Sequence, residues 1–487
     1  MKTAWILFPN QLYEDTTLLK EHDVFLVEEP MFIYDAVHRP IRPNKMKIAF
    51  LRAAAKQYAE RLGAVRYIDY EVALKDNYGF IARGKYERVM IYDPTDHGIV
   101  AKLESHIRVP LIIVESPNFL LSRADLEEFE SSRGGDGGAA GAKIKHSVFY
   151  EFVKKKLDIL VGVKSQDTYN RLPATAAAIE QIDNTRIAEE YTTGKVKEEA
   201  IAYAHKIAAG HCGDAEELGI YPTTSDAAYR AFKTFMKARY SKFGPYEDIF
   251  LSENPFVQHS VTSPALNAGL LDPRRLVSLA MEHNGVTLNS REGFVRQLIG
   301  WREYMRYLYV MHYEELVSAN SYRAKRVFGV GPGPGVWRSG TTGIVPYDTE
   351  LKKAIKYGYA HHIVRLMVFM GLFIIMEIDP AEVYKWFMEV VAIDAYDWVM
   401  VGNVYAMGYY YTGAMTRPYI SSSAYITRMS DYKKDGTWDK IWDALFYRFI
   451  SRANGVEAYK RNLAAIKASE LKEHIRVANQ FLKNVGE

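Results

Sequence analysis

The chain contains a single cysteine, Cys212, among its 487 residues. One thiol excludes an intramolecular disulfide framework and any cluster that requires four cysteine thiolates. Long apolar runs are also missing, because the most apolar stretch, residues 366–376, is far shorter than a membrane span. The first residues do not resemble a signal peptide, since their apolar run is short and strand-like. We therefore expect a cytoplasmic protein with no membrane partner.

A strong charge of one sign is missing as well. The formal net charge is only +3, so any surface that binds a polyanion must be local. Hydrophobic residues make up 48% of the chain and charged residues 25%, as in ordinary globular proteins, and the length suggests two or three domains. Six of the seven tryptophans lie at or after Trp301, so the second half has a different task from the first.

The first 125 residues predict an α/β domain. Short apolar runs occur at residues 4–9, 24–29, 66–70, 88–94 and 111–117, and helical patterns such as residues 45–62 separate them. Buried strands that alternate with helices indicate a parallel, Rossmann-like sheet. No GxGxxG follows the first strand, which argues against a dinucleotide site there. The loops at the carboxyl ends of the strands remain the expected place for a small ligand.

Residues 126–220 are expected to link two domains. Residues 131–142 are rich in glycine, and a group of basic residues follows, namely Lys143, Lys145, His146, Lys154, Lys155 and Lys156. Two interpretations stay open: a solvated linker with a charged helix, or a mobile basic loop that contacts phosphates. From about residue 187 the pattern is helical, and residues 221–487 predict a large all-α domain.

The most informative stretch is residues 357–403. Residues 361–376 predict a helix buried on most sides, although it begins with His361, His362 and Arg365. Such polar side chains are costly to bury unless something pairs with them. A second helix is expected to start at Asp379-Pro380, and Asp394 follows it. Arg365 and Asp394 could form a core salt bridge beside satisfied histidines, or both could hold a polar ligand.

Two further segments carry candidate binding groups. Residues 259–264 (HSVTSP) offer hydroxyls and backbone N–H groups before a helix, which suits a phosphate but is often only a cap. Residues 291–310 interleave arginines with aromatic residues on one predicted helix. That pattern can hold a flat heterocycle or stack bases, although a solvated basic stripe would look the same.

Taken together, five segments resemble the flavin-binding helical domain of the photolyase/cryptochrome superfamily: HSVTSPALNAGLL (259–271), REGFVRQLIGWREYMR (291–306), YAHHIVRLMV (359–368), IDAYDWVMVGNVYAMG (393–408) and RPYISSSAYITRMSDY (417–432). The nearest likeness is to the prokaryotic (6-4) photolyases that carry an iron–sulfur cluster. The resemblance spans almost the whole chain. It implies an α/β antenna-type domain followed by an all-α domain that binds FAD.

The resemblance also implies roles for individual residues. In relatives the matching positions line the FAD cavity, and here they are His259, Ser260, Thr262, Ser263, Leu266, Gln297, Arg302, His362, Arg365, Asp394 and Met400. The resemblance puts the first four of these at the diphosphate. It pairs Arg365, near flavin N5, with Asp394 across the isoalloxazine ring. Met400 stands where relatives place a polar or acidic group near N5, and a thioether does not readily relay a proton.

The same comparison implies a catalytic and DNA-binding face. One of the paired histidines, His361 or His362, would protonate a (6-4) lesion, because imidazole suits proton transfer near neutral pH. Tyr419 joins them as a catalytic candidate, and Tyr419 and Trp301 would face the flipped lesion. The residues expected to contact DNA are Trp301, Lys154, Arg306 and Arg417.

For photoreduction of the flavin, the resemblance implies aromatic stepping stones. Trp386 and Trp337 match the relatives' electron-transfer chain, and Trp398 is a further candidate that could equally be a core residue. Phe387 stands where relatives often have tyrosine. Phenylalanine cannot readily be oxidised and then lose a proton, so that branch is expected to be weaker.

The largest departure from the relatives is the missing cluster. Their cysteines lie near the position of Pro346 and shortly after residues 429–432, where this chain has none. We therefore predict no iron–sulfur cluster and no other metal, with Trp438, Trp442 and Phe446 packed in the vacated region. Residues 39–53 resemble the relatives' lumazine antenna region loosely, because Asn44 and Met46 depart from it. A lumazine-type antenna is therefore an option rather than an expectation.

The sequence thus predicts a monomeric, light-driven enzyme that uses FAD to repair (6-4) photoproducts in UV-damaged DNA, associated with the nucleoid if the source is prokaryotic. Three alternatives stay open: a cryptochrome-type photoreceptor without repair, a photolyase for cyclobutane pyrimidine dimers, and a light-independent helical DNA-binding module. The histidine pair favours (6-4) repair, whereas Met400 and Phe387 leave the photoreceptor alternative open.

Overall fold

The computed structural model describes residues 2–134, 143–183, 187, 189–329, 335–453 and 456–485. Residues 135–142 of the predicted basic loop lie outside this part of the chain. The N-terminal region forms a five-stranded parallel sheet in the order β3-β2-β1-β4-β5. Its strands are β1 (Thr3–Leu7), β2 (Asp23–Val27), β3 (Val65–Ile68), β4 (Arg88–Tyr92) and β5 (Leu111–Val114). The predicted Rossmann-like α/β domain is confirmed.

The burial of each strand agrees with its position in the sheet. Strand β1 is buried at all five positions and lies at the centre, whereas the edge strands β3 and β5 are partly exposed. The helices and 3-10 turns around it are η1 (Thr17–Leu19), η2 (Pro30–Phe32), α1 (Lys45–Leu62), α2 (Tyr70–Asp76), α3 (Gly79–Arg83) and α4 (His97–His106). Asn44, Asp69 and Asp96 cap α1, α2 and α4 by accepting backbone hydrogen bonds. Caps of this kind fix where each helix leaves the sheet.

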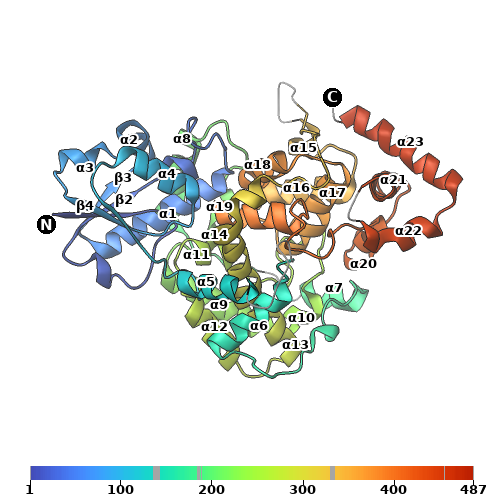
Figure 1. The fold of residues 1–487 in the computed structure, drawn as a ribbon, viewed down its shortest axis with the longest axis horizontal. Coiled ribbons are helices and arrows are strands. Elements are labelled where there is room, and N and C mark those ends of the chain that lie inside the picture. Colours follow the sequence, from blue (N-terminus) through green and yellow to red (C-terminus); the bar gives the residue numbers. More distant parts are fainter. Residues whose placement is uncertain are drawn as a thin grey trace.

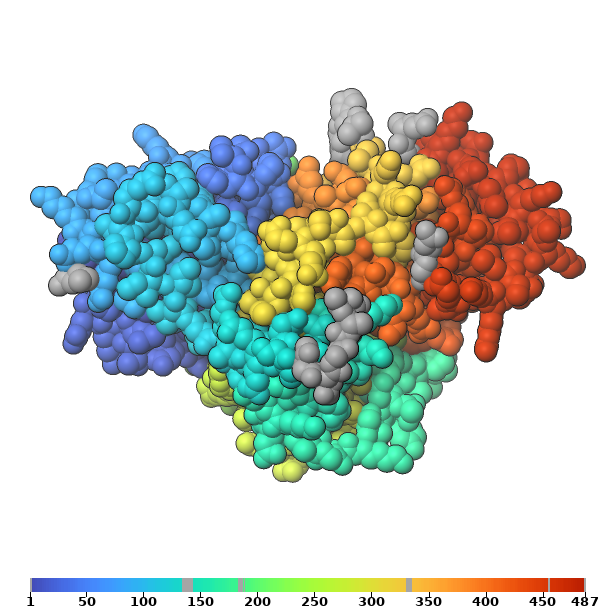
Figure 2. Space-filling view, viewed as in Figure 1, coloured from blue at the N-terminus to red at the C-terminus, as the bar shows by residue number. Residues whose placement is uncertain are grey.

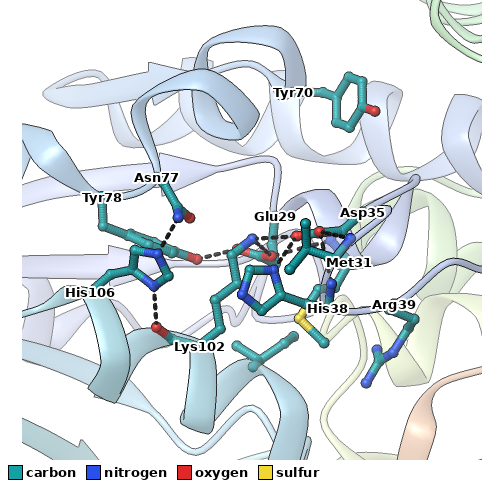
Figure 3. A network of polar contacts seen from close by, with 12 residues as sticks. Glu29, Met31, Asp35, His38, Arg39, Tyr70, Asn77, Tyr78, Lys102 and His106 are labelled. Carbon is teal, nitrogen blue, oxygen red and sulfur yellow. Dashed lines mark hydrogen bonds and ion pairs between the residues drawn. The ribbon is translucent and has the colours of Figure 1, made fainter.

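A buried ionic network fills the carboxyl end of β2 (Figure 3). Lys102 of α4 donates to Glu29 at 2.7 Å and to Asp35 at 2.9 Å, and all three side chains are buried. The hydroxyl of Tyr78 also donates to Glu29. Buried charges persist only when paired in this way. The cavity beside Glu29 has a volume of only about 10 Å³, no more than one water molecule needs.

The stretch expected to carry an antenna packs against other parts of the chain. Asn44 donates to the carbonyl of Ile355, and Lys45 Nζ donates to the carbonyls of His211 and Gly213. Arg52, in the same stretch, pairs with Glu28 at 3.0 Å. These side chains therefore have partners within the protein. The lumazine-type antenna stays a prediction.

The linking region is folded against both domains. Its elements are α5 (Arg123–Gly134), α6 (His146–Leu157), η3 (Asp167–Tyr169), α7 (Ala176–Asp183), α8 (Gly194–Ile207) and η4 (Glu216–Ile220). Helix α8 packs against α1 of the sheet domain, and α6 packs against the helical domain. Figure 2 shows the α5–α7 part of this region, in teal, in the lower middle of the molecule, whereas α8 lies beside the sheet domain (Figure 1).

In the described part of the chain from residue 225 onward, all named elements are helices. The first are α9 (Ser225–Ala238), α10 (Tyr240–Tyr246), α11 (Ser263–Asn267), α12 (Pro273–Glu282), α13 (Leu288–Val295), η5 (Arg296–Arg302), α14 (Glu303–Val317), α15 (Val336–Ser339) and α16 (Val345–Tyr357). Then come η6 (Val364–Met370), α17 (Gly371–Ile375), α18 (Pro380–Val390), α19 (Asp397–Val401) and η7 (Gly402–Met407). The last are α20 (Ser423–Met429), α21 (Trp438–Ile450), η8 (Glu457–Tyr459), α22 (Lys460–Ala465) and α23 (Ala468–Val485). Figure 1 shows the sheet domain at one end, α23 at the other, and the bundle between them.

A buried charge cluster joins the two domains. Arg39 of the sheet domain donates to both oxygens of Asp96 at 2.8 and 2.7 Å, and lies 3.9 Å from Asp397 of α19. Tyr309 donates to the same Asp397 at 2.5 Å. Burial, with the nearby charge of Asp96, raises the pKa of Asp397. This cluster fixes the segment around Asp394 against the sheet domain. No helix among the described residues is both long and apolar enough to cross a membrane.

Candidate functional site

A cavity of about 850 Å³ lies inside the helical domain. Its walls come from the loop before α11, from η5, η6 and η7, from residues 417–428, and from His146, Asp167 and Arg171 of the linking region. Its volume is in the range of sites that enclose a cofactor. Fourteen of the residues singled out from the sequence line it: His259, Ser260, Thr262, Ser263, Leu266, Gln297, Trp301, Arg302, His362, Arg365, Asp394, Trp398, Arg417 and Tyr419. Tertiary folding therefore brings all five motifs around one space.

Three of the helices that line the cavity contain π-helical turns. These turns are η5 (Arg296–Arg302), η6 (Val364–Met370) and η7 (Gly402–Met407). A π-turn is rare, and where it occurs it is often at a functional site. Each inserts an extra residue into a helix and so changes which side chains face the interior. The helix predicted over residues 361–376 is observed from residue 362 to 375, with η6 inside it.

The loop before α11 is held in a strained conformation. Val261 has a φ of +56°, which is an outlier for a β-branched residue. Its neighbours on both sides, Ser260 and Thr262, share a hydrogen bond of 2.8 Å between their hydroxyls. Both face the cavity. Strain of this kind persists only where the surroundings impose it, and it is concentrated at ligand sites.

Arg365 and Asp394 form a salt bridge, which is one of the two alternatives that the sequence left open. Arg365 Nη2 donates to the two carboxylate oxygens of Asp394 at 2.8 and 3.0 Å. Ser263 donates to the same carboxylate at 2.5 Å, and Asn267 donates to the backbone carbonyl of Asp394 at 3.1 Å. The ring of Tyr359 lies 5.2 Å from the guanidinium. Since Arg365 and Asp394 both line the cavity, the salt bridge also presents charge to a ligand.

The two histidines of the pair have different surroundings. His362 faces the cavity, which exposes more than a third of its side chain, whereas His361 is 2% exposed and does not line it. The ring of His361 stacks on that of His259, with 4.2 Å between centroids and an 18° angle. Desolvation by the surrounding cavity walls lowers the pKa of His362 to about 4, and the charge of Arg365 acts in the same direction. Both effects favour the neutral imidazole in the free protein.

Several polar atoms of the wall lack a hydrogen-bond partner within the protein. Arg302 donates through Nη1 to the carbonyl of Asn118 at 2.6 Å, but its buried Nε and Nη2 have no partner. Burial lowers the pKa of Arg302 to about 10. His259 Nδ1 is also buried without a partner. Buried donors of this kind normally bind something, so they indicate a polar ligand.

The outer part of the cavity combines aromatic rings with charge. Trp301 and Tyr419 line it, and so does the exposed Arg417. Sequence analysis left several other lining residues without a role in the site: His146, Asp167, Arg171, Glu247, Asn267, Arg296, Tyr359 and Asn403. Asn267 and Asn403 could have been singled out, because each is a polar residue in a largely apolar part of the motifs 259–271 and 393–408. Asp167 and Arg171 offered no such signal, because they lie outside every motif.

Two residues expected to contact DNA have other partners. Arg306 is 1% exposed, stacks over the ring of Phe119 and donates to the carbonyl of Leu121. Lys154 is also largely buried and pairs with Glu151 at 2.7 Å. Neither lines the cavity. The expectation rested on their positive charge, and the sequence does not reveal which face of a helix packs inward. In the structure neither side chain is placed to contact DNA.

Two of the three predicted electron-transfer residues, Trp386 and Trp337, lie close together in the buried core. Trp386 Nε1 donates to the carbonyl of Trp337 at 3.2 Å, and both side chains are buried. The ring centroid of Tyr347 lies 6.5 Å from that of Trp386 and 5.3 Å from that of Trp337. Phe387 packs 5.1 Å from Trp386. The aromatic contacts are thus continuous from Phe387 to Trp337.

Met400 and Phe387 line a smaller cavity that shares His362 and Arg365 with the main one. Met400 is 2% exposed and does not line the main cavity. Trp398 does line it, with Arg302 5.2 Å from its ring. Met400 therefore lies with Phe387 at the small cavity, beside His362 and Arg365 but outside the lining of the main cavity.

The region where relatives have cluster cysteines is packed with other side chains. Trp438, Trp442 and Phe446 are all buried, as predicted. The buried Tyr432 donates to Glu350 of α16 at 2.9 Å, which ties the two stretches together. Among the described residues, no group of three or more His, Cys, Asp or Glu side chains is placed to hold a metal ion. The absence of an iron–sulfur cluster stays a prediction.

Comparisons with known proteins point in one direction. The family model described as deoxyribodipyrimidine photo-lyase-related protein matches residues 5–218. A (6-4) photolyase of Agrobacterium fabrum is 29% identical over 446 residues, which cover 84% of this chain and 83% of that protein.

Solved structures give the same fold. A cryptochrome of Synechocystis superposes with a TM-score of 0.58 at 16% identity, covering 99% of this chain and 98% of the other. A class III photolyase of Agrobacterium tumefaciens superposes with a TM-score of 0.53 at 13% identity, again covering 99% and 98%. At such low identity these two likenesses concern the fold alone.

Proposed function

Since this chain belongs to the photolyase/cryptochrome superfamily, we propose that it is a light-driven DNA repair enzyme that uses FAD to reverse pyrimidine (6-4) pyrimidone photoproducts. The observation that carries this proposal is the placement of His362 beside the Arg365–Asp394 pair on the wall of one cavity. A proton donor and a pair of fixed charges thus face the same ligand space.

The residues present fit a flavin dinucleotide. The cavity has a suitable volume, and its wall contains buried donors without partners at Arg302 and His259. The hydroxyls of Ser260, Thr262 and Ser263 would hold the diphosphate, and the Arg365–Asp394 pair would hold the ring edge. Gln297 and Leu266 complete the wall. When bound, the reduced flavin supplies light absorption and the electron that starts repair.

His362 is the proposed general acid. Its imidazole is the member of the pair that faces the cavity, so it alone can reach a ligand directly. Desolvation by the cavity walls favours the neutral form of His362 in the free protein, and a negatively charged ligand nearby would raise its pKa toward 7. His361, stacked on His259, is proposed to fix the position of His362 rather than to touch the lesion. The sequence alone did not distinguish the role of His361 from that of His362.

The lesion must leave the duplex to reach this wall, because the cavity lies inside the helical domain. Trp301 and Tyr419 would contact the flipped bases, and Arg417 at the exposed rim would contact a phosphate. We expect one chain to suffice, since all of these groups come from the same protomer.

The test is illumination of the purified protein with duplex oligonucleotides that contain either a (6-4) photoproduct or a cyclobutane dimer, with repair read by chromatography. We expect blue-light-dependent repair of the (6-4) substrate. The variant His362→Ala should retain flavin and lose activity by a factor of about 10²–10⁴, as expected for loss of a general acid. His205→Ala is the matched control, because His205 lies on α8 and does not line the cavity. Undiminished repair by His362→Ala would refute the assigned role.

A second candidate function is a cryptochrome-type photoreceptor without repair. Phe387 and Met400 line the small cavity beside Arg365, and neither side chain can donate or accept a proton. Flavin photochemistry in a protein that repairs neither lesion would favour this alternative. A colourless protein without flavin would contradict both candidates.

A further inference from the structure

The indole of Trp301 is stacked on an imidazole that belongs to the linking region. The ring of His146 lies parallel to that of Trp301, with 3.7 Å between centroids and an angle of 9°. Trp301 belongs to η5, and His146 is the first residue of α6. Both residues line the cavity. One face of the indole is therefore covered by His146, which leaves the opposite face for a ligand.

The position of His146 is fixed by close packing. A Cβ atom on Gly300 would lie 3.1 Å from His146 Nε2 and 3.1 Å from a ring carbon of Tyr150. Only glycine lets α6 approach η5 this closely without displacing one of these rings. On its other edge, His146 contacts Tyr304 at a 5.3 Å centroid separation. The imidazole is thus held on several sides.

The stack is one of neutral rings. Burial, with the charge of Arg296 acting in the same direction, lowers the pKa of His146 to about 3. His146 Nε2 is buried and has no hydrogen-bond partner. His146 therefore carries no charge and makes no hydrogen bond through Nε2. What remains is the flat face of its ring, which packs on Trp301. Its contact with Trp301 is the contribution that the geometry shows.

We propose that His146 is a positioning residue that holds Trp301 as a stacking platform for an unpaired pyrimidine of the lesion. The proposal rests on the proposed function. The expected order of rings is His146, then Trp301, then the flipped base. Stacking of a base on an aromatic side chain contributes about 1–3 kcal/mol, and a platform that moves would lose part of it.

The experiment compares two variants of His146 and one of Gly300. His146→Leu removes the flat ring, and His146→Phe retains one. Gly300→Ala leaves the histidine in place but pushes on its ring, while improving the intrinsic helix propensity of the position. We expect His146→Leu and Gly300→Ala to lose about tenfold in affinity for a duplex with a (6-4) photoproduct, and His146→Phe to restore most of it.

Three readouts separate positioning from a general structural effect. Flavin content and affinity for an undamaged duplex should not change. KM for the lesion should rise while kcat stays within about twofold, because the platform binds substrate without taking part in proton transfer. His205→Ala serves again as the control. His146→Phe should behave like the wild-type protein and not like His146→Leu.

If His146→Leu binds the damaged duplex as tightly as the wild-type protein does, the inference is wrong. Equal losses in His146→Leu and His146→Phe would also overturn it, because then the flat ring is not the property that matters. Failure of the proposed function looks different, since then the wild-type protein itself would not prefer the damaged duplex.

Discussion

Replacement of Asp394 by asparagine provides the most direct test of the cavity wall. Arg365 and Asp394 have side chains that are 15% and 5% exposed, and two hydrogen bonds join them. Removing one partner of a buried ion pair costs about 3–5 kcal/mol, because the other charge stays buried. Asparagine preserves one acceptor, so we expect a loss near the lower end, about 3 kcal/mol in the free energy of unfolding.

The measurement should use flavin-free protein, because a ligand that binds only the folded state adds its own binding free energy to the stability. A loss of about 3 kcal/mol corresponds to a fall of about 6–12 °C in the melting temperature of the helical domain, followed by circular dichroism. The matched control is Glu71→Gln. It breaks the exposed pair with Lys206, in which the side chains are 60% and 64% exposed. An exposed pair contributes only about 0–1 kcal/mol.

A double variant separates the pair from the individual residues. Replacing Arg365 by methionine and Asp394 by leucine removes both charges, so neither is left buried alone. We expect the double variant to be more stable than Asp394→Asn, although it should no longer retain flavin. If Asp394→Asn in the flavin-free state lies within about 0.5 kcal/mol of the wild-type protein, the pair does not stabilise this wall and the reasoning is refuted.

Three further outcomes are expected. Burial, assisted by the charge of Arg39, lowers the pKa of Lys47 to about 7, so the unfolded chain binds more protons than the folded one up to about pH 10.4. Stability should therefore rise by about 2 kcal/mol between pH 7 and 9 in urea unfolding, and Lys47→Met should lose this rise. Trp386→Phe or Trp337→Phe should slow light-driven flavin reduction, followed by flavin absorbance, because each replaces an indole by a ring that is not readily oxidised. Affinity for DNA should fall steeply with salt, and Arg417→Ala should reduce the slope of log K against log salt by about 1 in anisotropy titrations.

Each of these outcomes has a control. The free energy of unfolding should depend on pH more steeply in the wild-type protein than in Lys47→Met. Equal dependence would mean that Lys47 is charged in the folded state. Trp5→Phe removes a buried tryptophan of the sheet domain and should leave photoreduction unchanged. Affinity for DNA that is independent of salt would mean that no basic rim binds the backbone.

The elements of the fold followed closely from local pattern. The apolar runs at residues 4–9 and 24–29 became the buried parallel strands β1 and β2, because strands covered on both faces need apolar residues at every position. The helix start at Asp379-Pro380 was also found, since a cap and a proline act on their own neighbours. The π-turns were not expected, because they depend on packing around a cavity that sequence does not display.

For the site, the sequence predicted which motifs meet but not which way each side chain points. The salt bridge between Arg365 and Asp394 was one of two alternatives, because two buried opposite charges can pair with each other or with a ligand. The different surroundings of His361 and His362 were not predicted, since adjacent residues differ only in the direction their side chains take from the backbone. Arg306 was expected at a DNA surface and is instead buried over Phe119.

The sequence by itself determined that an α/β domain is followed by an all-α domain. It also determined which segments supply the cavity wall and which charges need partners there. Only the tertiary structure decided that His146 covers Trp301, that Tyr347 packs near both Trp386 and Trp337, and that His362 faces the cavity. The reason is physical: periodicity and capping act over a few residues, whereas these contacts join residues far apart in the chain and depend on how closely whole helices can approach.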